Sequence, residues 1–261
     1  MNLIYIEEEK KYVVEDEKNN AIGEGIIREF EASRLYDKRR INYYIHTQSE
    51  REDVKLFLVD SFIKIGKLKR LKYPDYDAKL YNCCFSTDLE SQMFYKKVPG
   101  FVHDEGMLVL SKTLGKEVSI KNQFDLIEDN LESDKMIRNF IEEHSKIFVS
   151  VPYSVEKIRV LQKKNELKSY GLFDQDVLIG NVLILKEEDQ WWIEDLFVHS
   201  DYRKLGVADM LMKTAHNFLI RQEVSNIRLE VWSANKRAVN LYTKLGYELQ
   251  EESEILIGMS I

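Results

Sequence analysis

A short basic loop is the part of this sequence whose residue types most clearly suggest chemistry. The loop runs from Arg203 to Ala208, carries a second cation at Lys204, and contains Gly206. It follows an apolar run and precedes a stretch in which apolar residues recur with the period of a helix. The first turn of a helix offers unpaired N–H groups and the positive end of the helix dipole. The loop therefore predicts an anion-binding site, in which the small residues Gly206 and Ala208 let a ligand approach the backbone.

Two adjacent carboxylates, Glu194 and Asp195, interrupt the apolar strand that leads to this loop. A carboxylate in an apolar strand is costly to bury without a partner. Successive side chains of a strand point to opposite faces unless a bulge intervenes. The sequence leaves two interpretations: the pair serves as base and ammonium-binding group, or one of them faces solvent beside a lysine. Tyr242 is likewise either a proton donor or a core tyrosine.

Length and composition exclude several classes of function. The 261 residues allow one large domain or two ordinary ones, and a hydrophobic content of 44% suffices for a core. The net charge of −7 argues against nucleic-acid or anionic-membrane partners. The two cysteines are adjacent, and the five histidines lack metal-ligand spacing, so we expect neither a disulfide framework nor a metal. A cytoplasmic location is expected, because no secretory signal or apolar run of membrane-spanning length is present.

Strands and helices alternate along the chain, which predicts a mixed α/β fold with a sheet flanked by helices. Strands are predicted in the hairpins 11–30 and 167–185 and at 40–47, 78–85, 107–110, 191–198, 226–232 and 254–259. Helices are predicted at 53–67, 89–97, 132–145, 154–166, 207–219 and 236–245, with Pro152 between the third and the fourth.

The two halves of the chain resemble each other. Phe85-Ser86 and Tyr95 recur with the same spacing as Trp232-Ser233 and Tyr242, and Gly100-Phe101 follows in the same order as Gly246-Tyr247. Aligned on His46 and His199, the first half places carboxylates where the second has the basic loop, and these would repel an anion. We therefore expect a degenerate domain at 1–117 and a working domain at 118–261.

Two motifs of the second half resemble those of the GNAT superfamily of N-acetyltransferases. Arg203-x-x-Gly206-x-Ala208 is similar to the family's acetyl-CoA loop, although glycine is commoner at the last position. Asn235, with Leu241-Tyr242-x-x-Leu245-Gly246-Tyr247, is similar to its second signature. The resemblance covers about residues 120–261, and the first half looks like a truncated version. It implies two GNAT-like halves, each with a mixed, mostly antiparallel sheet flanked by helices.

The resemblance also implies roles for particular residues. Asn235 would contact the cofactor, and Tyr242 would lie near the thioester sulfur as the proton donor. Glu194 would be the base, as in the spermidine/spermine acetyltransferases that this run resembles, and Asp195 would bind the substrate. The backbone of the loop would hold the pyrophosphate of acetyl-CoA, and the preceding strand would pair with its pantetheine arm. These cofactor-binding residues are Arg203, Lys204, Leu205, Gly206, Val207 and Ala208 in the loop and Leu196, Phe197 and Val198 in the strand.

The expected function is transfer of an acetyl group from acetyl-CoA to a primary amine by direct attack in a ternary complex. The partner would be a small-molecule amine, and the acidic pair hints at a cationic one. A monomer or a homodimer is expected, without metal. Two alternatives stay open: transfer of another acyl or aminoacyl group, and a non-catalytic acyl-CoA-binding protein. The tyrosine and the paired carboxylates favour an enzyme.

Overall fold

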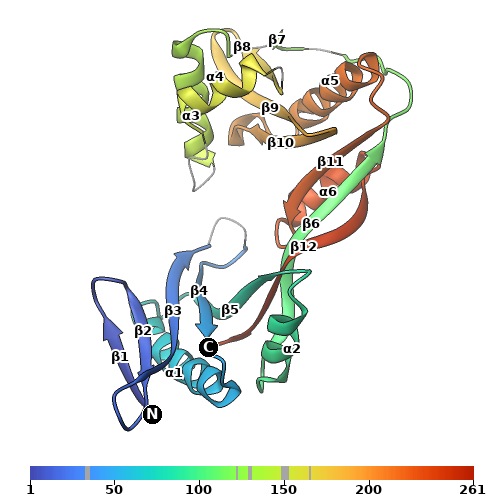
Figure 1. The fold of residues 1–261 in the computed structure, drawn as a ribbon. Coiled ribbons are helices and arrows are strands. Elements are labelled where there is room, and N and C mark those ends of the chain that lie inside the picture. The colour runs from blue at the N-terminus through green and yellow to red at the C-terminus, as the bar shows by residue number, and fades with distance from the viewer. Residues whose placement is uncertain (33–35, 122, 129–130, 148–152, 165) are drawn as a thin grey trace. The chain divides into compact units, whose positions relative to one another are not determined.

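The computed structural model describes residues 1–32, 36–121, 123–128, 131–147, 153–164 and 166–261. The chain forms two compact units (Figure 1). The first unit contains Met1–Leu108, Val231–Val239 and Glu251–Ile261, and the second contains Val109–Glu230 and Asn240–Gln250. Both are built from a mostly antiparallel sheet with flanking helices, so the predicted mixed α/β fold is confirmed. The predicted boundary between residues 117 and 118 concerns the two copies of the repeat and stays a prediction.

The sheet of the first unit has the strand order β1-β2-β3-β4-β5-β12. Its strands are β1 (Asn2–Ile6), β2 (Lys11–Glu15), β3 (Ala21–Glu31), β4 (Arg40–Gln48), β5 (Asp77–Phe85) and β12 (Glu248–Ser260). Only the pair of β4 and β5 is parallel among these neighbours. The helices α1 (Glu52–Arg70) and α2 (Leu89–Lys97) contribute apolar side chains to one core with alternate residues of β4 and β5.

The sheet of the second unit has the strand order β11-β10-β9-β8-β7. Its strands are β7 (Asp125–Glu128), β8 (Leu167–Asp174), β9 (Val177–Glu187), β10 (Gln190–Val198) and β11 (Asn226–Trp232). Its helices are α3 (Asp134–Ile147), α4 (Val155–Lys163) and α5 (Val207–Arg221), with a 3-10 turn at Ser200–Tyr202. The helix α6 (Lys236–Lys244) begins in the first unit and ends in the second. The strand β6 (Val102–Thr113) runs through the end of the first unit into the second.

The helices of the second unit cover both faces of its sheet (Figure 1). Ile137, Phe140 and Ile158, from α3 and α4, pack with Phe197 on one face. Burial of each such side chain contributes about 1.5–3 kcal/mol. On the other face α5 approaches β9 closely at Gly180, where a Cβ atom would lie only 3.0–3.1 Å from side-chain atoms of α5. The two helices of the α3–α4 pair and the helix α5 therefore fix the position of β10 from both sides.

The order strand–helix–strand–helix occurs in each half of the chain, as β4-α1-β5-α2 and as β10-α5-β11-α6. Gly100 and Gly246, which follow the last helix of each series, have almost the same left-handed backbone, with φ of +84° and +83°. The last strand departs from a simple tandem order, because β12 follows α6 in the sequence but pairs with β5 of the first unit.

The predicted elements are present, with two strands added and the ends of others shifted. The strands β1 and β7 were not predicted, and the closing strands β6 and β12 are longer than expected. Pro152, predicted to separate α3 from α4, lies outside the described residues. In the described part of the chain no helix is long and apolar enough to cross a membrane.

The close pairing of β12 with β5 requires a glycine at position 258. A Cβ atom on Gly258 would lie 2.0 Å from the carbonyl oxygen of Leu80 and 2.5 Å from the ring of Tyr81. We expect Gly258→Ala to lower the free energy of unfolding by about 2–3 kcal/mol, because backbone atoms of β5 must move. Thermal unfolding measures this effect. Gly115→Ala, where a Cβ would meet nothing within 4 Å, is the control, and equal melting temperatures for the two variants would contradict the argument.

Candidate active site

The parallel strands β10 and β11 pair over a short distance and then stop pairing. Their register consists of Trp192 with Arg228 and Ile193 with Leu229. Beyond Ile193, β10 continues to pair with β9 on its other edge as far as Val198. From Glu194 and Asp195 onward, the edge of β10 that faced β11 is therefore unpaired.

Strand alternation decides which main-chain groups of β10 face this open edge. The N–H of His199 donates to the carbonyl of Ile179 at 2.9 Å, so His199 faces the adjacent strand β9. Because main-chain groups alternate along a strand, those of Phe197 face β9 as well. Those of Leu196 and Val198 face the open edge, and the Val198 carbonyl accepts a hydrogen bond there from Nε of Arg203 at 3.3 Å. Of the three strand residues predicted to bind the cofactor, only Leu196 and Val198 thus offer main-chain groups, whereas the side chain of Phe197 lies in the core.

A β-bulge at Glu194 brings both carboxylates to one face of the sheet. Ile193 pairs with Ile184 and Asp195 pairs with Leu183, so Glu194 is the extra residue. The hydroxyl of Tyr153 donates to Oε1 of Glu194 at 2.8 Å, and Nε2 of His144 lies 3.3 Å from Oδ1 of Asp195. The bulge thus removes the alternation that would have separated the two side chains.

The surroundings of Glu194 raise its proton affinity. Desolvation is the largest cause that raises the pKa of Glu194, with a further contribution from the charge of Asp195, while the hydrogen bond from Tyr153 opposes both. Burial and then the two carboxylates raise the pKa of Tyr153, so that its hydroxyl keeps its proton at neutral pH. A carboxylate with a raised pKa is suited to accept a proton near neutral pH.

The predicted anion loop has the backbone conformation that such a site requires. Gly206, the N-cap of α5, has φ of +81° with open space where a Cβ would lie, and Lys204 also has a positive φ, +66°. Within the described residues no acceptor is found for the amide N–H groups of residues 204–209, before Met210 donates to the Gly206 carbonyl. The loop is tied to the end of β10 by Arg203. It can therefore present several amide groups and the positive end of α5 to an anion.

Tyr242 on α6 is buried, with 8% of its surface exposed. Burial is the main cause that raises its pKa to about 12, followed by the charge of Asp195. Among the described residues its hydroxyl has no hydrogen-bond partner, whereas the corresponding Tyr95 of the first unit is hydrogen-bonded to Oγ1 of Thr47 at 2.8 Å. Tyr242 is therefore a buried, protonated hydroxyl that lies close enough to Asp195 for the charge of the carboxylate to affect its pKa.

The remaining predicted residue, Asn235, forms hydrogen bonds at the start of α6. Its Oδ1 accepts a hydrogen bond from the amide of Ala238 at 3.2 Å, and its carbonyl accepts one from Val239 at 3.0 Å. It thus caps the start of α6, the helix that carries Tyr242. Asn235 belongs to the first unit, whereas Glu194, Asp195, Tyr242 and the loop all lie in the second.

Tyr153 and His144 were missed in the sequence as members of this site. His144 lies on the buried face of α3, one helical turn after Phe140 and two turns after Ile137. This helical spacing could have indicated that its side chain points inward. Tyr153 precedes Ser154, whose Oγ caps α4 by accepting from the amide of Lys157 at 3.2 Å. No feature of the sequence indicates that Tyr153 reaches β10.

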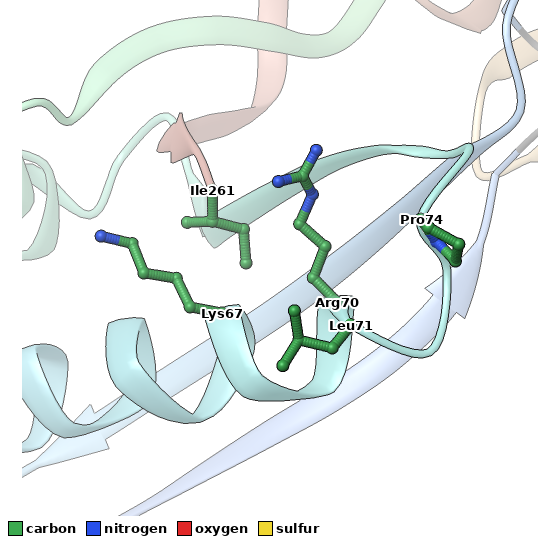
Figure 2. A pocket seen from close by; sticks show the side chains of 5 residues that line it. All are labelled: Lys67, Arg70, Leu71, Pro74 and Ile261. Atoms are coloured by element: carbon green, nitrogen blue, oxygen red, sulfur yellow. The ribbon is translucent and has the colours of Figure 1, made fainter.

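A cavity of about 490 Å³ lies in the first unit, at the C-terminal end of α1. Figure 2 shows its lining, which consists of Lys67, Arg70, Leu71, Pro74 and Ile261. Lys67 and Arg70 lie in the last turn of α1, where positive side chains are favourable because they offset the negative end of the helix dipole. The presence of these two cations therefore requires no bound ligand. Across the described residues no cluster of histidine, cysteine and acidic side chains could hold a metal ion.

Comparison with known proteins shows which family a part of the chain resembles. Residues 135–247, which contain the bulge, the loop and Tyr242, match the acetyltransferase (GNAT) family. This part of the chain therefore has the sequence features of the GNAT superfamily. A GCN5-related N-acetyltransferase from Sphaerobacter thermophilus has a similar fold, with a TM-score of 0.54 and 14% identity over 96% of this chain and 80% of that one.

Two curated relatives match part of the chain. Streptothricin acetyltransferase of Escherichia coli is 30% identical over 103 residues, which are 38% of this chain and 57% of the relative. Thialysine N-epsilon-acetyltransferase of Mus musculus is 36% identical over 63 residues, 24% of this chain and 37% of the relative. The chain thus spans less than two thirds of the length of either relative.

Proposed function

We propose that the chain is an N-acetyltransferase that moves an acetyl group from acetyl-CoA to a primary amine of a small acceptor. The observation that carries this proposal is the end of β10–β11 pairing at Ile193, next to a glycine-capped helix whose first amides have no acceptor in the described part of the chain. Residues 118–261 would be the working copy and residues 1–117 a degenerate one. The protein would act in the cytoplasm as a monomer or homodimer.

The chain's own groups fit the two polar parts of acetyl-CoA. The loop Arg203–Ala208 would hold the pyrophosphate through its amides and the dipole of α5, with the side chain of Lys204 exposed beside it. The outward main-chain groups of Leu196 and Val198 would pair with the amide groups of the pantetheine arm, as an added strand would. Acetyl-CoA supplies the acetyl group as a thioester, which an amine can attack directly.

The carboxylates and Tyr242 would handle the protons. The attacking amine must be neutral, although a free alkylamine has a pKa near that of lysine, about 10. Asp195 would bind the acceptor as its ammonium form, and Glu194 would take the proton. Tyr242, which stays protonated, would donate to the departing thiolate.

The acidic pair favours a cationic acceptor. The names of the two relatives specify streptothricin and thialysine, both amines, as the molecules that those enzymes acetylate. The test is release of free coenzyme A thiol from acetyl-CoA, with thialysine, streptothricin, spermidine and a wider amine library as acceptors. Acetylation of an amine by the purified chain is expected. Tight binding of acetyl-CoA with no acetylated product from any amine would instead indicate a non-catalytic acyl-CoA-binding protein.

Replacement of Tyr242 tests the proton donor. We expect Tyr242→Phe to lower kcat about tenfold to a hundredfold, because the thiolate then leaves without a proton, while the KM for acetyl-CoA changes little. Steady-state kinetics at saturating acetyl-CoA measures this. Tyr95→Phe, in the first unit, is the matched control and should leave kcat unchanged. Equal kcat values for Tyr242→Phe and the wild type would make Tyr242 a core residue.

A further inference from the structure

We infer that His144 is a positioning residue, which holds the carboxylate of Asp195 so that its second oxygen receives the ammonium group of the acceptor. This inference rests on the proposed acetyltransferase function. It assigns a task to a histidine that the proposed reaction does not otherwise use, and it separates the tasks of the two adjacent carboxylates.

The contact between His144 and Asp195 is buried. His144 is 2% exposed and the side chain of Asp195 is 14% exposed, with Nε2 of the imidazole 3.3 Å from Oδ1 of the carboxylate. The ring of His144 also packs against Phe140 and Tyr153, with centroids 5.7 and 6.0 Å away. The imidazole is therefore held by packing in a position from which it contacts one oxygen of Asp195.

The charged groups around the bulge have different partners. Glu194 accepts from the hydroxyl of Tyr153 at 2.8 Å. Glu143, next to His144 on α3, lies 3.2 Å from Nε2 of His199 and 2.7 Å from Nζ of Lys146. The contact between His144 and Asp195 is thus one of the polar contacts by which α3 and the segment around Tyr153 meet the end of β10.

The second oxygen of Asp195 is the reason to assign a ligand rather than a purely structural pair. Oδ2 is buried, and no donor among the described residues forms a hydrogen bond of good geometry with it, although the Tyr153 hydroxyl, which donates to Glu194, is close enough to interact with Asp195. A buried carboxylate oxygen without a donor is unfavourable and requires an explanation. An ammonium group supplies a charge-assisted donor, and an orientation fixed through Oδ1 keeps Oδ2 in place for it.

A simple packing role for His144 makes a different prediction, because phenylalanine would fill the same space. We expect His144→Phe to raise the KM for the acceptor amine about tenfold, with kcat and the affinity for acetyl-CoA little changed, since the close contact between Nε2 and the charged carboxylate of Asp195 is lost. His144→Gln retains a donor near the position of Nε2 and should restore most of the wild-type KM. Ile137→Val, a core change on the same helix, controls for loss of packing and should leave the KM unchanged.

A double-mutant cycle shows whether His144 acts through Asp195. The KM of Asp195→Asn should not rise further when His144→Phe is added, because the group that His144 holds is already altered. Multiplicative effects of the two changes, or an unchanged KM for His144→Phe, would overturn the inference.

A readout without turnover separates this inference from the proposed function. In NMR spectra of the whole chain, the ring N–H resonance of His144 should shift in Asp195→Asn and remain in place in Glu194→Gln. If no amine is acetylated, the proposed function is wrong, but the shift of the His144 resonance still shows whether His144 contacts Asp195. If an amine is acetylated and the resonance does not respond to Asp195→Asn, the positioning role alone is wrong.

Discussion

Gly206→Glu is expected to weaken the binding of acetyl-CoA at least about a hundredfold, a loss of about 2.7 kcal/mol of binding free energy. Gly206 has φ of +81°, where a residue with a Cβ atom is strained by roughly 1–2 kcal/mol. The open space at this position is the space through which a phosphate would approach the amides of the loop. A carboxylate there would also repel the pyrophosphate. Calorimetric titration with acetyl-CoA measures the change.

Gly100→Glu is the matched control, because Gly100 has φ of +84° and is exposed in the first unit. It should cost similar backbone strain and lower the melting temperature, yet leave the dissociation constant for acetyl-CoA unchanged. If both variants bind acetyl-CoA as the wild type does, the loop does not hold the pyrophosphate.

The sequence predicted the elements of the fold more reliably than their assembly. Periodic apolar residues identified the strand at 226–232 and the helix at 89–97 with the ends that the structure has. The short strands β1 and β7 were missed because each is an edge strand with few buried residues, so its pattern carries little signal. The pairing of β12 with β5 could not be predicted, since an apolar strand pattern does not specify which sheet edge the strand joins.

The candidate site was predicted where it depends on local sequence and not where it depends on packing. Gly206 at the N-cap of α5 follows from a glycine before a helical pattern. Glu194 and Asp195 point to the same face only because a bulge interrupts the strand. Regular strand alternation would predict opposite faces for two adjacent residues. Tyr153 and His144 reach the carboxylates only because α3 and the segment before α4 cover that face of β10.

The first unit illustrates how the same element order can lose the features of this site. The strand β4 stays paired with β5 through Tyr44, and the side chain of Asn82 then donates to the carbonyl of Ile45 at 3.2 Å. The residues before α1 include Arg51, which is paired with Asp53 at 2.6 Å, and no glycine with positive φ caps this helix. In the second unit the Val198 carbonyl, the counterpart of the Ile45 carbonyl, accepts from Arg203 of the loop, and the N-cap of the helix is Gly206 with open space beside it. This difference supports a single working site per chain.

Glu194→Gln is expected to lower kcat/KM for the acceptor amine about a hundredfold to ten-thousandfold, the range for loss of a general base. Because desolvation raises the pKa of Glu194, its base form is lost as pH falls through a range above the ordinary one for glutamate. The wild type should therefore show an acid limb in its pH–rate profile at that higher range. The limb should be absent from the residual activity of Glu194→Gln. Rates measured from pH 5 to pH 9 with a constant-ionic-strength buffer test both statements.

Stability distinguishes this loss from damage to the fold. A carboxyl group whose pKa is raised by folding contributes stability below its unfolded pKa and loses it as pH rises through the folded value. At neutral pH the ionised Glu194 is thus slightly unfavourable for folding, and the neutral amide of Glu194→Gln can still accept from Tyr153. The variant should melt no lower than the wild type. Glu187→Gln, at the end of the neighbouring strand β9, is the control for loss of a nearby negative charge and should retain the acid limb. A limb that persists in Glu194→Gln would transfer the role of base to Asp195 or to water.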